Sequence, residues 1–239
     1  MCVTCLQNSF RPSRRGLILG ATATLLFGNA AGAKEKKPPP KPQNVLSPDA
    51  SLERLLKGNA RYVEGVSRRH DFKHEREALA KGQNPYAAIL SCADSRIAPE
   101  YAFDSGRGDL FVCRVAGNFA NTETIASLEY AVAVLNAPLI LVLGHESCGA
   151  VDAAIKSLAD NTTLPGHMPS LVAGVASAVK AVSQQGGDTL SKAIRQNVID
   201  TVANLTSATP ILSAAVEQRK IRVVGGVYRL GDGRVDMVT

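Results

Sequence analysis

The chain has 239 residues, of which 45% are hydrophobic and 5% aromatic, so it suits one globular domain with extensions and has enough apolar material for one sizeable core. Its formal net charge of +6 lies entirely in residues 1–41, which hold seven basic residues and one acid. Because residues 42–239 are formally neutral, we expect no nucleic-acid partner for the main domain.

Residues 1–33 have the layout of a secretory signal peptide. Arg14 and Arg15 precede an apolar run over residues 17–27, and the small residues that follow end in an A-x-A cleavage pattern at 31–33. The run is too short for a good membrane span, so we expect none after cleavage. The paired arginines resemble a twin-arginine signal, which exports folded proteins, with an ordinary signal peptide or an uncleaved anchor as the alternative. We expect an exported, periplasmic protein; the thylakoid lumen and the extracellular space are alternatives.

Residues 34–47 form a linker rich in Pro and Lys, which favours an extended, solvated tether. The sequence therefore places the main domain at residues 48–239. Ser47 can cap a first helix that carries leucines at helical spacing, and a second, polar helix is expected over residues 70–81.

Four short apolar runs have the character of strands that are buried on both faces of a parallel sheet. Helical patterns separate them, and Asn121 can cap one of these helices. The alternation predicts an α/β fold with a mostly parallel β-sheet flanked by helices. The strands are expected at 86–91, 110–115, 139–143 and 221–228, and the helices at 121–135, 149–159, 170–184 and 189–208.

Cysteines and a histidine follow two of the expected strands. Cys92 lies at the carboxyl end of the first strand, and His145 and Cys148 follow the strand that ends at Leu143. In an open parallel sheet, ligands bind outside the carboxyl ends of the strands. Two cysteines and a histidine with one position left open are a known catalytic zinc arrangement. The alternative is a pair of buried cysteines beside a satisfied histidine, with Cys113 a further buried small residue.

Asp94 and Arg96 lie two residues apart, next to Cys92. A carboxylate held by a guanidinium stays ionised and keeps its direction, so Asp94 can accept a hydrogen bond from a hydroxide on the metal. The alternative is an ion pair in a surface loop. Glu146 is either a supporting group of the site or an exposed loop acid.

The motifs CADSR at 92–96 and GHESCGA at 144–150 resemble the paired signature of the β-carbonic anhydrases. Further stretches agree with that family, and the similarity extends over residues 52–238. They are LLKGNARYVEG at 55–65, DLFVCRVAGN at 109–118, ASLEYAV at 126–132 and GGVY…GRV at 225–235. The resemblance implies reversible hydration of carbon dioxide to bicarbonate and a proton, with one zinc ion per chain.

The resemblance also implies roles for individual residues. Cys92, His145 and Cys148 match the zinc ligands, and Asp94 with Arg96 matches the catalytic dyad. The family's small substrate pocket corresponds to Gln83, Phe111, Ala116 and Tyr130.

The chain departs from the family's bicarbonate-inhibited members at one position. Those members carry a tryptophan where this chain has Ile89, so we expect a site that stays open. Arg114 and Asn118 are expected to support the site or a dimer contact, since family members form homodimers or multiples of them.

Three questions stay open at this stage. Relatives with the same zinc site hydrolyse carbonyl sulfide or carbon disulfide, and a non-catalytic zinc-binding assembly protein is a further alternative. The candidate proton shuttles are His70, His74 and His167, which the sequence cannot place relative to the site.

Overall fold

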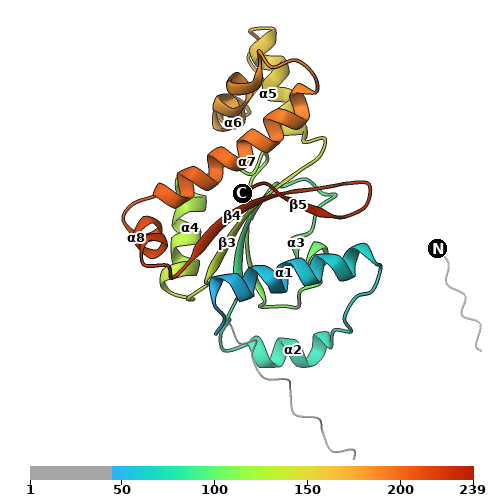
Figure 1. The fold of residues 1–239 in the computed structure, drawn as a ribbon, viewed down its shortest axis with the longest axis vertical. Coiled ribbons are helices and arrows are strands. Elements are labelled where there is room, and N and C mark those ends of the chain that lie inside the picture. The colour runs from blue at the N-terminus through green and yellow to red at the C-terminus, as the bar shows by residue number, and fades with distance from the viewer. Residues whose placement is uncertain (1–44) are drawn as a thin grey trace, which may run out of the picture. The chain divides into compact units, whose positions relative to one another are not determined.

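A five-stranded sheet forms the centre of the fold in the computed structural model, which describes residues 45–239 (Figure 1). Its strand order is β2-β1-β3-β4-β5, and only the β4–β5 pair is antiparallel. The expected mostly parallel sheet is therefore confirmed. The strands are β1 (Ala87–Ser91), β2 (Leu110–Arg114), β3 (Leu139–His145), β4 (Arg222–Tyr228) and β5 (Val235–Met237).

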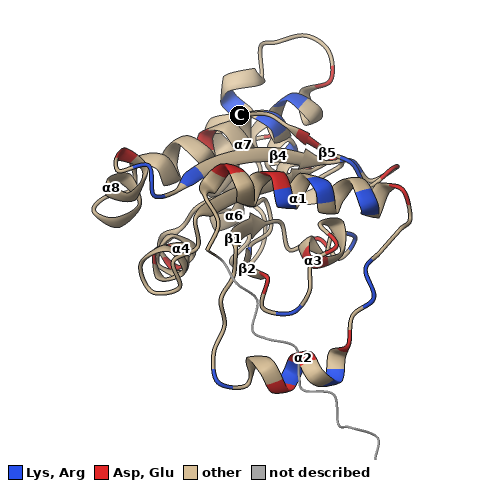
Figure 2. Ribbon diagram, turned by 60° about the horizontal axis from the view of Figure 1, so that its bottom comes forward, with Lys and Arg blue, Asp and Glu red and all other residues tan. Residues whose placement is uncertain are grey.

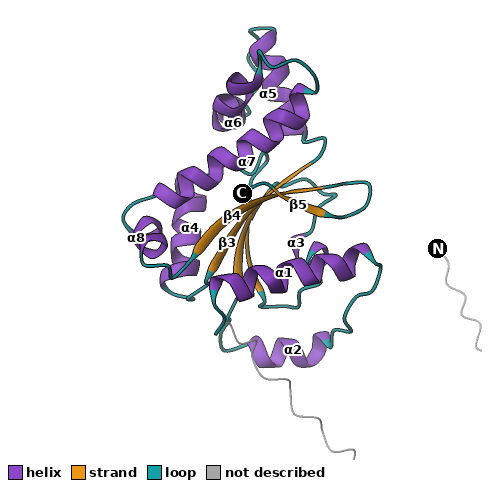
Figure 3. Cartoon of the chain, viewed as in Figure 1, coloured by secondary structure: helices purple, strands orange, loops and turns teal. Residues whose placement is uncertain are grey.

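Helices lie along the sheet and beyond one of its edges (Figure 3). Side chains cap several of them at the first turn: Ser47 Oγ accepts from the Ala50 N–H, and Asn121 Oδ1 accepts from the Thr124 N–H, as the sequence predicts. The helices are α1 (Pro48–Val63), α2 (Phe72–Leu79), α3 (Pro99–Ala102), α4 (Thr122–Ala133), α5 (Gly149–Ala159), α6 (Pro169–Val182), α7 (Thr189–Ser207) and α8 (Ile211–Glu217).

Both faces of the sheet are covered because successive side chains of a strand point to opposite sides. In β1, Ala87 and Ile89 pack in a cluster with residues of α1 and α3, whereas Ala88 and Leu90 pack in a second cluster with residues of α4, α7 and α8. A third cluster joins α5, α6 and α7 and includes Cys92. The functional residues thus lie where the sheet meets this third cluster.

Gly144 allows α7 to approach the end of β3. A Cβ atom at this position would lie 2.6 Å from Val198 Cγ2, closer than real contacts allow. The backbone of β3 and the side chains of α7 are therefore in direct contact one residue before His145, which holds the end of the strand in place.

The structure differs from the sequence-based expectations in two ways. The strand at 110–114 is only half-buried, because it is an edge strand that pairs, within the described residues, only with β1. Three short elements were not expected: α3, α8 and β5. They have four, seven and three residues, too few for a hydrophobic period to stand out in the sequence.

Charged residues of both signs lie on α1, where the acids Asp49 and Glu53 precede the bases, and they are distributed over the other helices (Figure 2). Among residues 45–239, no helix has the length and apolar character that crossing a membrane requires. The predicted signal peptide at 1–33 lies outside the described residues. The same is true of residues 34–44, the first part of the predicted linker at 34–47.

Candidate metal centre and active site

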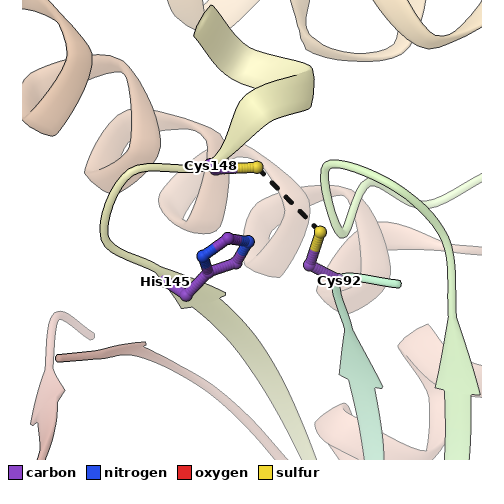
Figure 4. Close-up of side chains that lie close together, drawn as sticks. All are labelled: Cys92, His145 and Cys148. Carbon is purple, nitrogen blue, oxygen red and sulfur yellow. Dashed lines mark hydrogen bonds between the residues drawn. The ribbon is translucent and has the colours of Figure 1, made fainter. Parts of the chain in front are cut away.

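Cys92, His145 and Cys148 lie together at the carboxyl ends of two neighbouring strands (Figure 4). Cys92 directly follows β1, His145 is the last residue of β3, and Cys148 is the N-cap residue of α5. Because β1 and β3 are parallel and pair Ser91 with Leu143, the residues that follow these two positions lie together at the carboxyl ends of the strands. All three side chains are buried.

The spacing of the three side chains suits a tetrahedral metal ion. Their ligand atoms all lie within 4.8 Å of one another, and the two sulfur atoms are 4.0 Å apart. Two sulfurs at a Zn–S distance of about 2.3 Å in tetrahedral geometry would be separated by roughly 3.8 Å. The cluster therefore needs little rearrangement to hold zinc.

The imidazole of His145 presents an unused nitrogen to the cluster. Its Nδ1 lies 2.7 Å from the carbonyl oxygen of Glu146, so Nδ1–H donates and Nε2 carries the lone pair. His145 Nε2 is buried and has no hydrogen-bond partner among residues 45–239. A buried polar atom without a partner is costly, and a metal ion would satisfy it.

The two thiols share a negative charge. A hydrogen bond from the Cys148 thiol lowers the pKa of Cys92 to about 4, with further contributions from the neighbouring His145 side chain and from the Gly117 N–H, whose nitrogen is 3.3 Å from the sulfur. The same contact raises the pKa of Cys148. One thiolate is therefore present at neutral pH, and a metal ion would stabilise the second. Two thiolates and a neutral imidazole are a donor set that zinc prefers, so the residues fit the ion.

Asp94 lies beside the cluster and is bound by Arg96 through three hydrogen bonds. Arg96 Nε and its backbone N–H both donate to Oδ1 at 2.9 Å, and Nη2 donates to Oδ2 at 2.7 Å. These bonds hold the pKa of Asp94 well below its usual range, so the carboxylate is ionised. Oδ2 is 3.9 Å from Nε2 of His145, close enough to act on a group bound at the cluster.

Arg114 supports the loop that carries Cys92 and Asp94. Its guanidinium donates to the carbonyl oxygens of Cys92 at 2.9 Å, Asp94 at 2.7 Å and Ile97 at 2.9 Å. The sequence suggests this residue as a support. Asn197 is a support that sequence reasoning missed: from α7, its Nδ2 donates to the carbonyl oxygen of Gly117 at 2.7 Å. A polar residue between the apolar positions of the 189–208 helix is the signal that could have revealed it.

The structure separates the residues expected to line the substrate pocket. Ala116 lies in the loop after β2, next to the Gly117 N–H that contacts Cys92. Gln83 is exposed in the loop before β1, at the opposite end of that strand from Cys92. The remaining two residues lie on β2 and α4, with Phe111 and Tyr130 ring centroids 6.2 Å apart.

Asn118 and Cys113 follow the expectations in part. Asn118 is buried in the turn after Gly117, at a positive φ of 42°, which suits a supporting role. Cys113 is half-buried on the edge strand rather than fully buried, and burial raises its pKa.

None of the candidate proton shuttles belongs to the metal-ligand cluster. His70 and His74 flank the start of α2 and pair with Glu75 and Asp71. His70 lines a cavity of about 920 Å³ between α2 and α3, and Cys92, His145 and Cys148 are not among its lining residues. His167 is exposed just before α6.

The chain is similar to known carbonic anhydrases. The family model described as carbonic anhydrase matches residues 87–235. Carbonic anhydrase 2 of Mycobacterium tuberculosis is 40% identical over 189 residues, which cover 79% of this chain and 91% of the relative. A carbonic anhydrase of Pseudomonas aeruginosa is 37% identical over 171 residues, covering 67% of this chain and 76% of the relative.

Solved structures agree with these relatives. The β-carbonic anhydrase CcaA superposes with a TM-score of 0.60 at 27% identity and covers 79% of this chain and 98% of its own. The Coccomyxa β-carbonic anhydrase in complex with acetazolamide superposes with a TM-score of 0.61 at 28% identity. The match covers 78% of this chain and 86% of the Coccomyxa chain. The chain therefore belongs to the β-carbonic anhydrase family. It is an enzyme, a carbonic anhydrase, which interconverts carbon dioxide and bicarbonate.

Proposed function

We propose that one Zn²⁺ per chain is bound by Cys92, His145 and Cys148, and that Asp94 and Arg96 form the catalytic dyad for carbon dioxide hydration beside it. The observation that carries this proposal is the buried, unpartnered Nε2 of His145, which lies within 4.8 Å of both sulfur atoms and 3.9 Å from an ionised carboxylate oxygen. A buried nitrogen lone pair without a hydrogen-bond partner is costly, and a metal ion held together with the two sulfurs would satisfy it.

A zinc ion held by these residues would lower the pKa of a water molecule toward neutrality. Asp94, ionised beside the cluster, would accept a hydrogen bond from that water or hydroxide and orient it toward the substrate. Arg96 occupies both oxygens of Asp94, which keeps the carboxylate from turning toward the ligands. Arg96 Nη2 also donates to the carbonyl oxygen of Ser147 at 3.2 Å. The same guanidinium therefore contacts both Asp94 and the loop between His145 and Cys148.

Zinc content tests the ligand assignment. Replacing Cys148 with Ser removes a thiolate, and we expect the bound zinc to fall from about one ion per chain to a small fraction and carbon dioxide hydration to fall with it. The measurement is metal analysis of the purified protein with stopped-flow hydration on the same sample. Cys113→Ser, on the edge strand, is the matched control and should keep its zinc. Full zinc content in Cys148→Ser would refute the assignment.

Mutant kinetics test the dyad. Asp94→Asn and Arg96→Ala should each lower turnover about 100-fold, by loss of the acceptor or of its orientation. Because both side chains act on one attacking oxygen, the double variant should be little worse than the poorer single variant, whereas independent effects would multiply. Stopped-flow hydration with zinc content held constant measures this. Asp152→Asn with Lys156→Ala, an exposed ion pair on α5, is the control pair and should leave turnover unchanged. Multiplied losses would contradict the proposal.

We further propose that Gln83, Phe111 and Tyr130 complete the substrate pocket of a second copy in a homodimer or a multiple of it. Within one chain, the five residues of β1 separate Gln83 from Cys92 by about 16 Å at roughly 3.3 Å per residue. Tyr130 is 47% exposed and Phe111 lies on the half-buried edge strand, so both are accessible to a partner. A two-fold contact would supply these side chains reciprocally.

Subunit complementation tests this arrangement. A heterodimer of Cys148→Ser and Tyr130→Ala chains, purified with two different tags, should contain one native site and recover about half of the wild-type rate per dimer. Each variant homodimer should stay well below that rate. A rate equal to the mean of the two homodimers, or a monomer in light scattering, would contradict a shared pocket.

We also propose that the protein is exported through the twin-arginine route to the periplasm, on the basis of Arg14 and Arg15 before the apolar run. Export of a folded chain would protect the thiols, because zinc binds them before they reach an oxidising compartment. Replacing both arginines with lysine should leave the unprocessed protein in the cytoplasm, as cell fractionation would reveal. Normal processing of the double variant would rule out this route.

A further inference from the structure

Glu146 lies between the ligands His145 and Cys148 and connects their loop to the β4–β5 hairpin. Its backbone N–H donates to the carbonyl oxygen of Tyr228 at 3.0 Å, which continues the β3–β4 pairing one residue past His145. Its side-chain Oε2 accepts a hydrogen bond from the Leu230 N–H, also at 3.0 Å. The residue is therefore held at two atoms by the same hairpin.

The carbonyl group of Glu146 sets the direction of the His145 ring. It accepts the hydrogen bond from Nδ1–H at 2.7 Å, which leaves Nε2 facing the two sulfurs. The next residue, Ser147, has a positive φ of 51°, a conformation that costs energy for a residue with a side chain. The peptide that carries this carbonyl therefore needs support from both sides. Arg96 supplies one contact, at the Ser147 oxygen, and the Glu146 side chain supplies the other.

The Glu146 carboxylate makes two contacts that differ in strength, one with the Leu230 N–H and one with Arg229. The hydrogen bond from the Leu230 N–H to Oε2 has the normal length of 3.0 Å and joins the loop to the backbone of the hairpin. Arg229 Nε lies 4.0 Å from Oε1, is 43% exposed and is also shared with Asp232 and Asp236. Exposed ion pairs of this kind contribute little. The hydrogen bond, rather than the charge, is thus the contact that holds the loop.

We propose that Glu146 is a positioning residue of the metal centre: by accepting the Leu230 N–H, its side chain holds the 145–148 loop so that His145 Nε2 faces the two sulfurs. The inference depends on the proposed zinc site and adds a residue outside its ligands. The Glu146 side chain is exposed, as the second of the two alternatives in the sequence analysis expected, and the proposal gives this exposed residue a supporting contact. Outer-shell partners of metal-bound histidines affect metal affinity by about 10–100-fold.

Zinc affinity of four single variants tests the proposal. Glu146→Gln keeps an oxygen that can accept from Leu230 and should bind Zn²⁺ within about threefold of the wild-type affinity. Glu146→Asp keeps the charge but is one methylene too short, and Glu146→Ala has no acceptor; both should bind zinc about tenfold more weakly. Asp236→Ala removes a carboxylate from the same arginine without touching the loop, and should match the wild type. Competition with a chromophoric chelator measures all four.

The visible spectra of the Co²⁺-loaded proteins provide a second measurement, because they report the geometry of the metal centre and do not change with overall stability. In the Co²⁺-loaded proteins, the visible bands of Glu146→Asp should differ from those of the wild type, whereas Glu146→Gln should retain them. If Glu146→Ala does not fold, the Gln and Asp variants still decide the question. Equal losses in Gln and Ala, or unchanged affinity and spectra in Asp and Ala, would overturn the role of Glu146. A wild-type chain that binds no zinc would instead overturn the proposed zinc site.

Discussion

Parallel pairing of β1 with β3 is the constraint on which the functional site depends. Their register puts Ser91 beside Leu143, so Cys92 and the loop from His145 to Cys148 leave the sheet at the same edge. A shift of one residue would turn the side chains that follow each strand toward the opposite face. Alternate residues of β1 pack in clusters on both sides of the sheet, and this burial makes such a shift costly.

Backbone carbonyl groups provide much of the support for the site. Arg114 binds three of them in the loop after β1, Arg96 binds that of Ser147, and His145 donates to that of Glu146. Main-chain acceptors are present whatever the side chain, so their use places few demands on the neighbouring residues. It does require that the two loops that carry these carbonyl groups each have one defined shape.

Electrostatic requirements in the site are met by neighbours rather than by solvent. Asp94 is 16% exposed and remains ionised because Arg96 binds both of its oxygens. The two thiols are buried and stabilise one negative charge by sharing a proton. The two sulfurs and His145 Nε2 would therefore stabilise a divalent cation. The carboxylate of Asp94 beside them is held by the guanidinium of Arg96.

The sequence by itself determined the class of fold and which residues gather at the site. Continuous apolar runs predicted the parallel strands, of which the one at 110–114 is a half-buried edge strand, and the cysteines and histidine directly after two of those runs predicted the buried cluster that could hold a metal ion. Only the tertiary structure decided which groups act together across the chain. The contact of Glu146 with Leu230 joins residues 84 positions apart, and that of Asn197 with Gly117 joins residues 80 apart. No local periodicity records such pairs, because they exist only once helices and strands have packed. The distance between Gln83 and Cys92, by contrast, was already implied by the strand predicted at 86–91, because an extended β1 places the two residues at its opposite ends.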